Sequence, residues 1–310
     1  MKIVFMGTPD FAVPCLRKLA ESGHEVSAVF TQPDKPKGRG YKMIPTPVKS
    51  LALEYNIPVY QPISLRKGED AENSMKILRD IAPELIVVTA YGQILPKEIL
   101  ELPEYGCINI HASLLPKYRG AAPINWVLLN GETETGVTSM QMNEGLDTGD
   151  MLIKKSTPIG KNETYSELYS RLSEIGGEVL METIDGILNN TITPEKQDDS
   201  LSCYSPMIEK TMSFLDFNFS VQDIHNTIRG VTGYTTLNGK RLKVFASEIS
   251  DCNLPDQVGT VVDTERFGVS CWNGVIIFNE VQLEGGKRMK TADFLRGRKL
   301  TKGEKLGQEG

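Results

Sequence analysis

Residues 85–90, L-I-V-V-T-A, form an unbroken apolar run in a chain of 310 residues. Such a short, continuous run is typical of a β-strand covered on both faces, as in a parallel sheet. Around it, strand-like runs occupy 3–6, 26–30 and 107–110, and helical patterns occupy 11–21, 46–55 and 71–82. Strands that alternate with helices predict an α/β fold with a doubly wound, mostly parallel, Rossmann-like sheet.

The pattern of the sequence changes near residue 187. The longest helical pattern, at 163–184, is interrupted by Gly176-Gly177, and residues 188–206 then lose periodicity, which indicates a linker. After it come one helical stretch and several short β segments, with turn signals such as Asn238-Gly239. We therefore expect a first domain over 1–187, a linker over 188–206, and a smaller β-barrel domain over 207–310.

Composition excludes several classes of protein. The net charge is −6, which argues against a chain that coats nucleic acid non-specifically. Five scattered cysteines without a C-x-x-C motif argue against a zinc ribbon, so no metal is expected, and they suit the reducing cytoplasm. No run approaches 18 apolar residues, so we expect no membrane span. We expect a cytoplasmic protein that acts as a monomer.

Two segments that follow predicted strands are candidates for ligand binding. Residues 7–12, G-T-P-D-F-A, follow a strand but lack the second glycine of G-x-G-x-x-G, which argues against dinucleotide binding. Residues 31–49 form a long loop that is rich in proline and glycine and basic in composition. Such a loop can track phosphates, with Tyr41 stacking on a base, or it can be a solvated surface loop. Its basic residues are Lys35, Lys37, Arg39, Lys42 and Lys49.

A third signal lies at 107–111, C-I-N-I-H. Alternate residues of a strand share a face, so Asn109 and His111 project together near the carboxyl end. An amide can stabilise an oxyanion and an imidazole can exchange protons, which suits acyl transfer. Asp147, in the glycine-rich 145–150, can supply the carboxylate that orients the imidazole. The alternative is a structural histidine, and the sequence alone does not bring Asp147 to it.

An enzyme nucleophile is hard to find near this motif. No G-x-S-x-G elbow is present, and Ser113 stands only two residues past His111. The pattern therefore favours direct attack by a substrate amine on an activated acyl donor.

These motifs resemble those of a known family. The stretch N-I-H-A-S-L-L-P-K-Y-R-G-A-A-P-I at 109–124, with G-L-D-T-G-D at 145–150, is similar to the folate-dependent formyltransferases. The resemblance covers essentially the whole chain and includes the start M-G-T-P-D-F-A and the loop Q-P-D-K-P-K-G-R-G; it is strong over 1–186 and weaker in the last hundred residues. It implies transfer of a formyl group from 10-formyltetrahydrofolate to the α-amino group of methionyl initiator tRNA.

The resemblance also implies roles for individual residues. Asn109 would stabilise an oxyanion, His111 would handle protons, and Asp147 would orient and charge His111. The basic loop would contact the tRNA acceptor arm through Lys37, Arg39 and Lys42, and the C-terminal domain would be an OB-like barrel along the tRNA. The folate pocket would comprise Tyr91, Gly92, Gln93, Ile94, Leu95, Ser113, Leu114, Leu115 and Pro116.

Other activities share parts of this pattern. Formyltransferases that act on a nucleotide sugar or on glycinamide ribonucleotide have the same N-x-H and Asp set, but the long basic loop and the extra β domain favour tRNA. A formyl-folate hydrolase would use water in place of the amine. A non-catalytic RNA-binding module would leave the N-x-H motif incidental.

Overall fold

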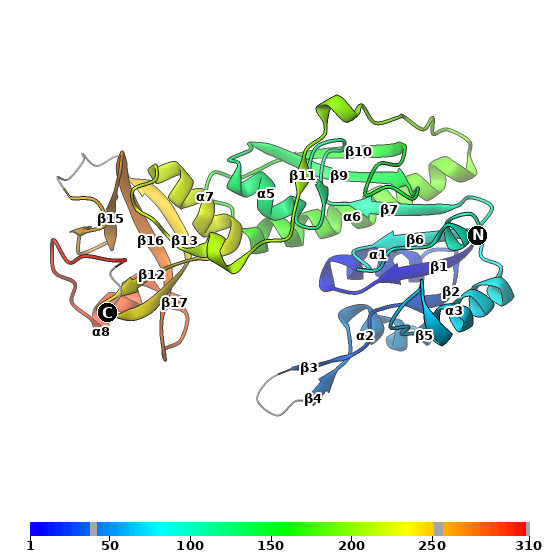
Figure 1. The fold of residues 1–310 in the computed structure, drawn as a ribbon, viewed down its shortest axis with the longest axis horizontal. Helices are drawn as coiled ribbons and strands as arrows, with labels where there is room; N and C mark the ends of the chain where they lie inside the picture. The colour runs from blue at the N-terminus through cyan, green and yellow to red at the C-terminus, as the bar shows by residue number, and fades with distance from the viewer. Residues whose placement is uncertain (38–41, 251–256, 308–310) are drawn as a thin grey trace. The chain divides into compact units, whose positions relative to one another are not determined.

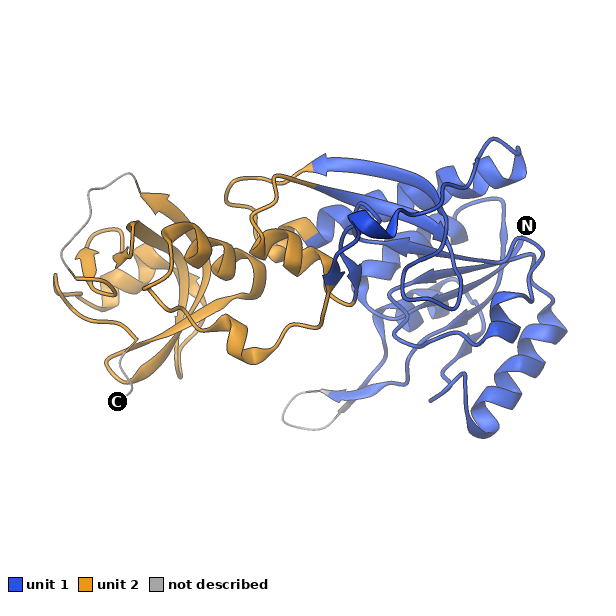
Figure 2. Cartoon of the chain, turned by 45° about the horizontal axis from the view of Figure 1, so that its top comes forward, with its two compact units in different colours: residues 1–120, 135–157, 169–204 blue, residues 121–134, 158–168, 205–310 orange. Residues whose placement is uncertain are grey.

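Seven strands form the central sheet of the N-terminal part of the chain (Figure 1). The computed structural model describes residues 1–37, 42–250 and 257–307, which divide into two units (Figure 2). Unit 1 is residues 1–120, 135–157 and 169–204, and unit 2 is residues 121–134, 158–168 and 205–310. No helix within these described ranges is long and apolar enough to cross a membrane.

The sheet of unit 1 has the order β10-β9-β7-β6-β1-β2-β5. The five strands from β7 to β5 are parallel, whereas β9 runs antiparallel to β7. This confirms the predicted doubly wound, mostly parallel sheet. The strands are β1 Lys2–Gly7, β2 Glu25–Phe30, β5 Val59–Tyr60, β6 Leu85–Thr89, β7 Cys107–His111, β9 Glu134–Gln141 and β10 Met151–Pro158.

Helices cover this sheet because alternate strand residues supply apolar side chains to each face. On one face, Val4 and Ile86 join a buried cluster that includes Leu78 of α3. Unit 1 also carries two short hairpin strands, β3 Lys35–Lys37 and β4 Lys42–Ile44, within the predicted basic loop. The helices are α1 Val13–Ala20, α2 Pro47–Glu54, α3 Gly68–Ile81, α4 Lys97–Leu100 and α6 Tyr165–Leu188.

The predicted interruption at Gly176-Gly177 is wrong, because α6 runs through both glycines. A Cβ at Gly176 would lie 3.2 Å from a side-chain carbon of Ile110, and one at Gly177 would lie 2.9 Å from Lys18. The two glycines therefore let α6 approach β7 and α1 closely. Close packing outweighs the helix propensity that glycine lacks.

Unit 2 is built on an antiparallel sheet of order β12-β13-β16-β15-β14, with β17 paired to β16. Asn238 and Gly239 both have positive φ and join β12 to β13, as the hairpin signal predicts. The smaller β-rich second domain is thus confirmed as an antiparallel sheet domain. Its elements are α5 Pro123–Leu129, α7 Val221–Val231, β12 Gly233–Leu237, β13 Lys240–Ser250, β14 Val261–Asp263, β15 Gly268–Cys271, β16 Gly274–Leu283, β17 Met289–Lys290 and α8 Thr291–Gly297.

Candidate active site

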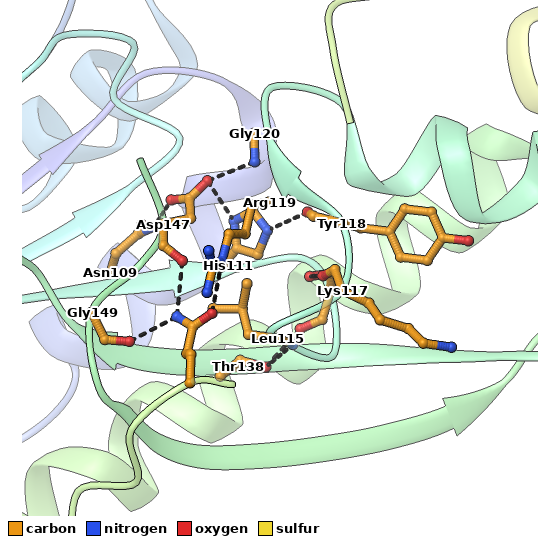
Figure 3. A network of polar contacts seen from close by, with 12 residues as sticks. Asn109, His111, Leu115, Lys117, Tyr118, Arg119, Gly120, Thr138, Asp147 and Gly149 are labelled. Carbon is orange, nitrogen blue, oxygen red and sulfur yellow. Dashed lines mark hydrogen bonds and ion pairs between the residues drawn. The ribbon is translucent and has the colours of Figure 1, made fainter. Parts of the chain in front are cut away.

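The carboxyl end of β7 carries the two polar residues of the N-x-H motif. Asn109 and His111 stand on the same face of β7, which lies between β6 and β9 (Figure 3). Both neighbouring strands pair with β7 and so fix the backbone that carries the two side chains. The structure also brings Asp147 to this point, and the three predicted catalytic side chains meet in unit 1.

His111 is held in one orientation by a backbone carbonyl. Its Nε2 lies 2.9 Å from the carbonyl oxygen of Tyr118. A carbonyl only accepts, so Nε2 carries a hydrogen, and neutral His111 has its lone pair on Nδ1. Nδ1 lies 3.7 Å from Oδ2 of Asp147, and the two side chains are only 7% and 13% exposed. Any proton that His111 takes up must therefore arrive at Nδ1, where the carboxylate stabilises the resulting imidazolium.

Asp147 is held by donors from two other segments. The backbone N–H of Gly120 donates to Oδ2 over 2.8 Å, and Asn109 Nδ2 lies 3.4 Å from Oδ1. Asp147 itself has φ of +51°, in the left-handed region that non-glycine residues seldom adopt. Two residues on, a Cβ at Gly149 would lie 1.6 Å from the carbonyl oxygen of Gln141. The loop can therefore follow this path only with glycine at 149.

The segment after β7 is fixed from within the fold. Ser113 Oγ donates to the carbonyl of Lys117 over 2.7 Å. Thr138 Oγ1 donates to the carbonyl of Ser113 and accepts from the backbone N–H of Leu115. Ser113 and Leu115 are buried, whereas Leu114 and Pro116 are half-buried. Within this part of the predicted folate pocket, Leu114 and Pro116 therefore have the side-chain surface to offer a ligand.

The other predicted folate segment, 91–95, follows β6 to the same edge of the sheet. Tyr91 and Leu95 are buried in the core, and both amide atoms of Gln93 bond the backbone at 62 and 65. Burial raises the pKa of Tyr91. Gly92 is exposed, and Ile94 is 67% exposed. A ligand here would meet main-chain groups and Ile94 rather than the core side chains.

The predicted basic loop contains the β3–β4 hairpin, in which Lys37 pairs with Lys42. Arg39 and Tyr41 lie outside the described residues. Lys49 is occupied at the base of this segment, because its Nζ lies 2.6 Å from Asp34 and 2.7 Å from Gln61. The hydrogen bond from Lys49 is the main reason that the pKa of Asp34 is lowered. Lys49 thus anchors the hairpin.

Gln197 is a residue of this site that sequence reasoning missed. Its side chain contacts the main chain of the Asp147 loop and the side chain of Arg119. It lies in the stretch without periodicity that the sequence analysis assigned to a linker, so no pattern pointed to it.

The other two histidines have different surroundings. His225 is buried in unit 2, with Nδ1 2.9 Å from Ser247 Oγ and Nε2 3.1 Å from the carbonyl of Lys161. Burial lowers its pKa. His24 is part-buried near the N-terminus, and burial lowers its pKa as well. Among the residues described, no group of three or more His, Cys, Asp or Glu side chains is placed to hold a metal ion.

Comparison with known proteins gives matches over both units. Residues 1–184 match the formyl transferase family, and residues 207–299 match the formyl transferase C-terminal domain. A methionyl-tRNA formyltransferase of Geobacter sulfurreducens is 50% identical over 100% of this chain and 98% of its own length. Its counterpart in Geobacter metallireducens is 51% identical over 99% of each chain.

Solved structures share the fold. A sugar 3N-formyl transferase crystallised with dTDP and 5-N-formyl-THF has a TM-score of 0.68, with 23% identity over 93% of this chain and 99% of its own. An N-formyltransferase of Helicobacter canadensis in complex with folinic acid and dTDP-3-aminofucose has a TM-score of 0.67, with 21% identity over 93% of this chain and 100% of its own.

Proposed function

The chain belongs to the formyl transferase family, and from this we propose that it transfers a formyl group from 10-formyltetrahydrofolate to the α-amino group of methionyl initiator tRNA. The observation that carries the proposal is the meeting of Asn109, His111 and Asp147 in a chain about half identical, end to end, to enzymes of that name. The cluster supplies an amide, a base and a carboxylate. This set suits an acyl transfer in which the acceptor amine is the nucleophile.

The folate co-substrate would supply the activated formyl group. The segments around the cluster offer apolar surface to a ligand, because Ile94 and Leu146 expose large apolar side chains there. Gly92 and the half-buried Leu114 and Pro116 add surface from the two segments that follow β6 and β7. We assign the binding of folate to these two segments.

The chain's own residues divide the chemistry between them. Asn109 Nδ2 is the donor for the formyl oxygen as that oxygen gains negative charge. The amine must lose a proton as its nitrogen bonds to the formyl carbon, and His111 Nδ1 is the nitrogen able to take it, since Nε2 is bound to the carbonyl of Tyr118. Asp147 stabilises the charged ring across 3.7 Å. The same proton can then pass to the departing nitrogen of the donor.

We assign contact with the tRNA acceptor arm to β3, β4 and the residues between them in sequence, 38–41. Lys37 and Lys42 are paired in the register of the two strands, and Arg39 lies between them in sequence. Lysine and arginine side chains suit contact with a phosphate backbone. Two further points stay predictions: that the protein acts as a monomer, and that it acts in the cytoplasm.

The test is formyl transfer from 10-formyltetrahydrofolate to three acceptors in parallel: methionyl initiator tRNA, the same tRNA uncharged, and a nucleotide amino sugar. We expect transfer only to the charged tRNA. Transfer only to the sugar would overturn the acceptor assignment and keep the catalytic one. Arg39→Ala should raise the KM for tRNA at least tenfold and leave that for folate unchanged, whereas Arg66→Ala, an exposed arginine elsewhere in unit 1, should change neither.

A further inference from the structure

The segment between the two family matches packs against the catalytic cluster. Residues 185–206 fall outside both matches. Within them we define the strap as residues 195–203, all of which belong to unit 1. The strap begins where Glu195 pairs with Met151 through two backbone hydrogen bonds of 2.8 and 2.9 Å. A segment that only connected two domains would need no such contacts.

Gln197 is the strap residue that reaches the Asp147 loop. Its Nε2 donates to the carbonyl of Asp147 over 2.8 Å and to that of Gly149 over 2.7 Å. Its Oε1 accepts from Nε of Arg119 over 2.9 Å. A glutamine amide has two N–H donors, and here both are used on one loop. The side chain therefore fixes the main chain on either side of residue 148.

These contacts close a ring around the catalytic carboxylate. Gln197 binds the main chain of Asp147 and the side chain of Arg119, and the residue after Arg119, Gly120, donates its N–H to the Asp147 carboxylate. The ring thus holds Asp147 at both ends, by its carbonyl and by its Oδ2. Asp147 has φ of +51°, which is a strained backbone conformation for a residue with a side chain. If one end of the loop were released, the loop would therefore relax to a conformation of lower energy.

The strap also supports the partner of His111. Cys203 accepts a hydrogen bond at Sγ from the backbone N–H of Tyr118, and its carbonyl accepts from the N–H of Arg119. The carbonyl of Tyr118 is the group that fixes the His111 ring. Both halves of the His111–Asp147 pair therefore rest on residues that the strap holds.

We propose that Gln197 is a positioning residue for the formyl transfer: its two donated hydrogen bonds hold Asp147 where its carboxylate stabilises charged His111. This rests on the catalytic roles given above. Gln197 lies behind Asp147, on its main-chain side, so it acts through the carboxylate and not on substrate. A displacement of a reacting group by about 1 Å can lower the rate by up to about 10²-fold. We therefore expect a loss in kcat of about 30- to 100-fold, with KM values unchanged within about threefold.

Gln197→Glu is the sharpest variant. It keeps the length of the side chain and its contact with Arg119, but replaces both donors with an oxygen that faces two carbonyl oxygens. Gln197→Met, which is similar in size and uncharged, should give the same loss. Lys196→Ala is the matched control, because Lys196 is the exposed neighbour of Gln197 on the strap. All variants are made in the full-length chain and compared with the wild type by steady-state and single-turnover formyl transfer. Thermal unfolding of each protein is measured as well.

A double-mutant cycle separates positioning from general stability. If Gln197 acts through Asp147, then Gln197→Glu should cost less than about threefold in an Asp147→Asn background. Equal losses in both backgrounds, or an unchanged kcat in Gln197→Glu, would overturn the proposal. An inactive wild-type protein would contradict the proposed function instead, since the wild type and Lys196→Ala must first form formyl-methionyl-tRNA.

Discussion

Removing the negative charge that faces His111 is the most direct perturbation of the site. Asp147→Asn keeps the size of the side chain, and the amide oxygen can still accept from the backbone N–H of Gly120. What disappears is the charge 3.7 Å from Nδ1 of His111, together with the weak acceptor that Oδ1 offers Asn109 at 3.4 Å. In the proposed mechanism His111 gains charge as the acceptor amine gives up its proton, so the lost interaction belongs to that step, and the variant should lose kcat rather than affinity.

The size of the expected loss in kcat follows from the separation and the burial of the His111–Asp147 pair. Both side chains are largely shielded from water, so an effective dielectric constant of about 20 applies, and two unit charges 3.7 Å apart then interact by about 4.5 kcal/mol. A factor of ten in rate corresponds to about 1.4 kcal/mol. We therefore expect kcat to fall by about three orders of magnitude.

Single-turnover formyl transfer with saturating donor and charged tRNA measures this loss directly. Folate binding, followed by calorimetry, should stay within about threefold of the wild type. Glu144→Gln is the matched control, because it removes one exposed negative charge from the same loop and should leave kcat unchanged. A kcat for Asp147→Asn within tenfold of the wild type would refute the role of the carboxylate in stabilising charged His111.

Three further variants test the supporting structure. Thr138→Val deprives the N–H of Leu115 of its acceptor, so the free energy of unfolding in urea should fall by about 2–3 kcal/mol, and a loss below about 0.5 kcal/mol would contradict this account. Lys49→Met removes the ion pair with Asp34 that anchors the hairpin, so the KM for tRNA should rise several-fold while kcat holds; an unchanged KM would show that the anchor is dispensable. The pKa of buried His225 in the folded protein lies below the unfolded value of 6.5, so its contribution to stability is present above pH 6.5 and is lost as the pH falls. His225→Gln should therefore lose less stability than the wild type between pH 7 and pH 5. Parallel plots of unfolding free energy against pH for the two proteins would contradict this role of His225.

Much of the fold could be predicted because its signals are local. The apolar run at 85–90 predicts a buried strand, and β6 spans Leu85–Thr89. The N-x-H spacing predicts two side chains on one face, and β7 places Asn109 and His111 so. Asn238-Gly239 predicts a tight hairpin, and both residues adopt positive φ. In each case the backbone geometry follows from a few neighbouring residues.

Other features depend on contacts between distant segments. In the sequence, the glycines at 176 and 177 suggest that a helix is interrupted. The reason for them is the close approach of α6 to Ile110 and Lys18, which only the tertiary structure shows. Gln197 has no signal in its neighbours, since its partners lie 48 to 78 positions away in the chain. The ion pair of Lys49 with Asp34 likewise cannot be told from a free basic residue by composition. Polar contacts of this kind leave no periodicity.

The left-handed backbone at Asp147 has a consequence for how this enzyme can be engineered. Glycine at this position would relieve the left-handed backbone, but it would also leave the N–H of Gly120 without its acceptor, so the two effects on stability oppose each other. Asparagine adopts left-handed φ more readily than most residues and keeps an oxygen for Gly120, so it preserves the loop while it removes the charge proposed to act in catalysis. A library screened for heat resistance alone should therefore tolerate asparagine at 147 and lose turnover, so heat resistance and turnover must be selected together.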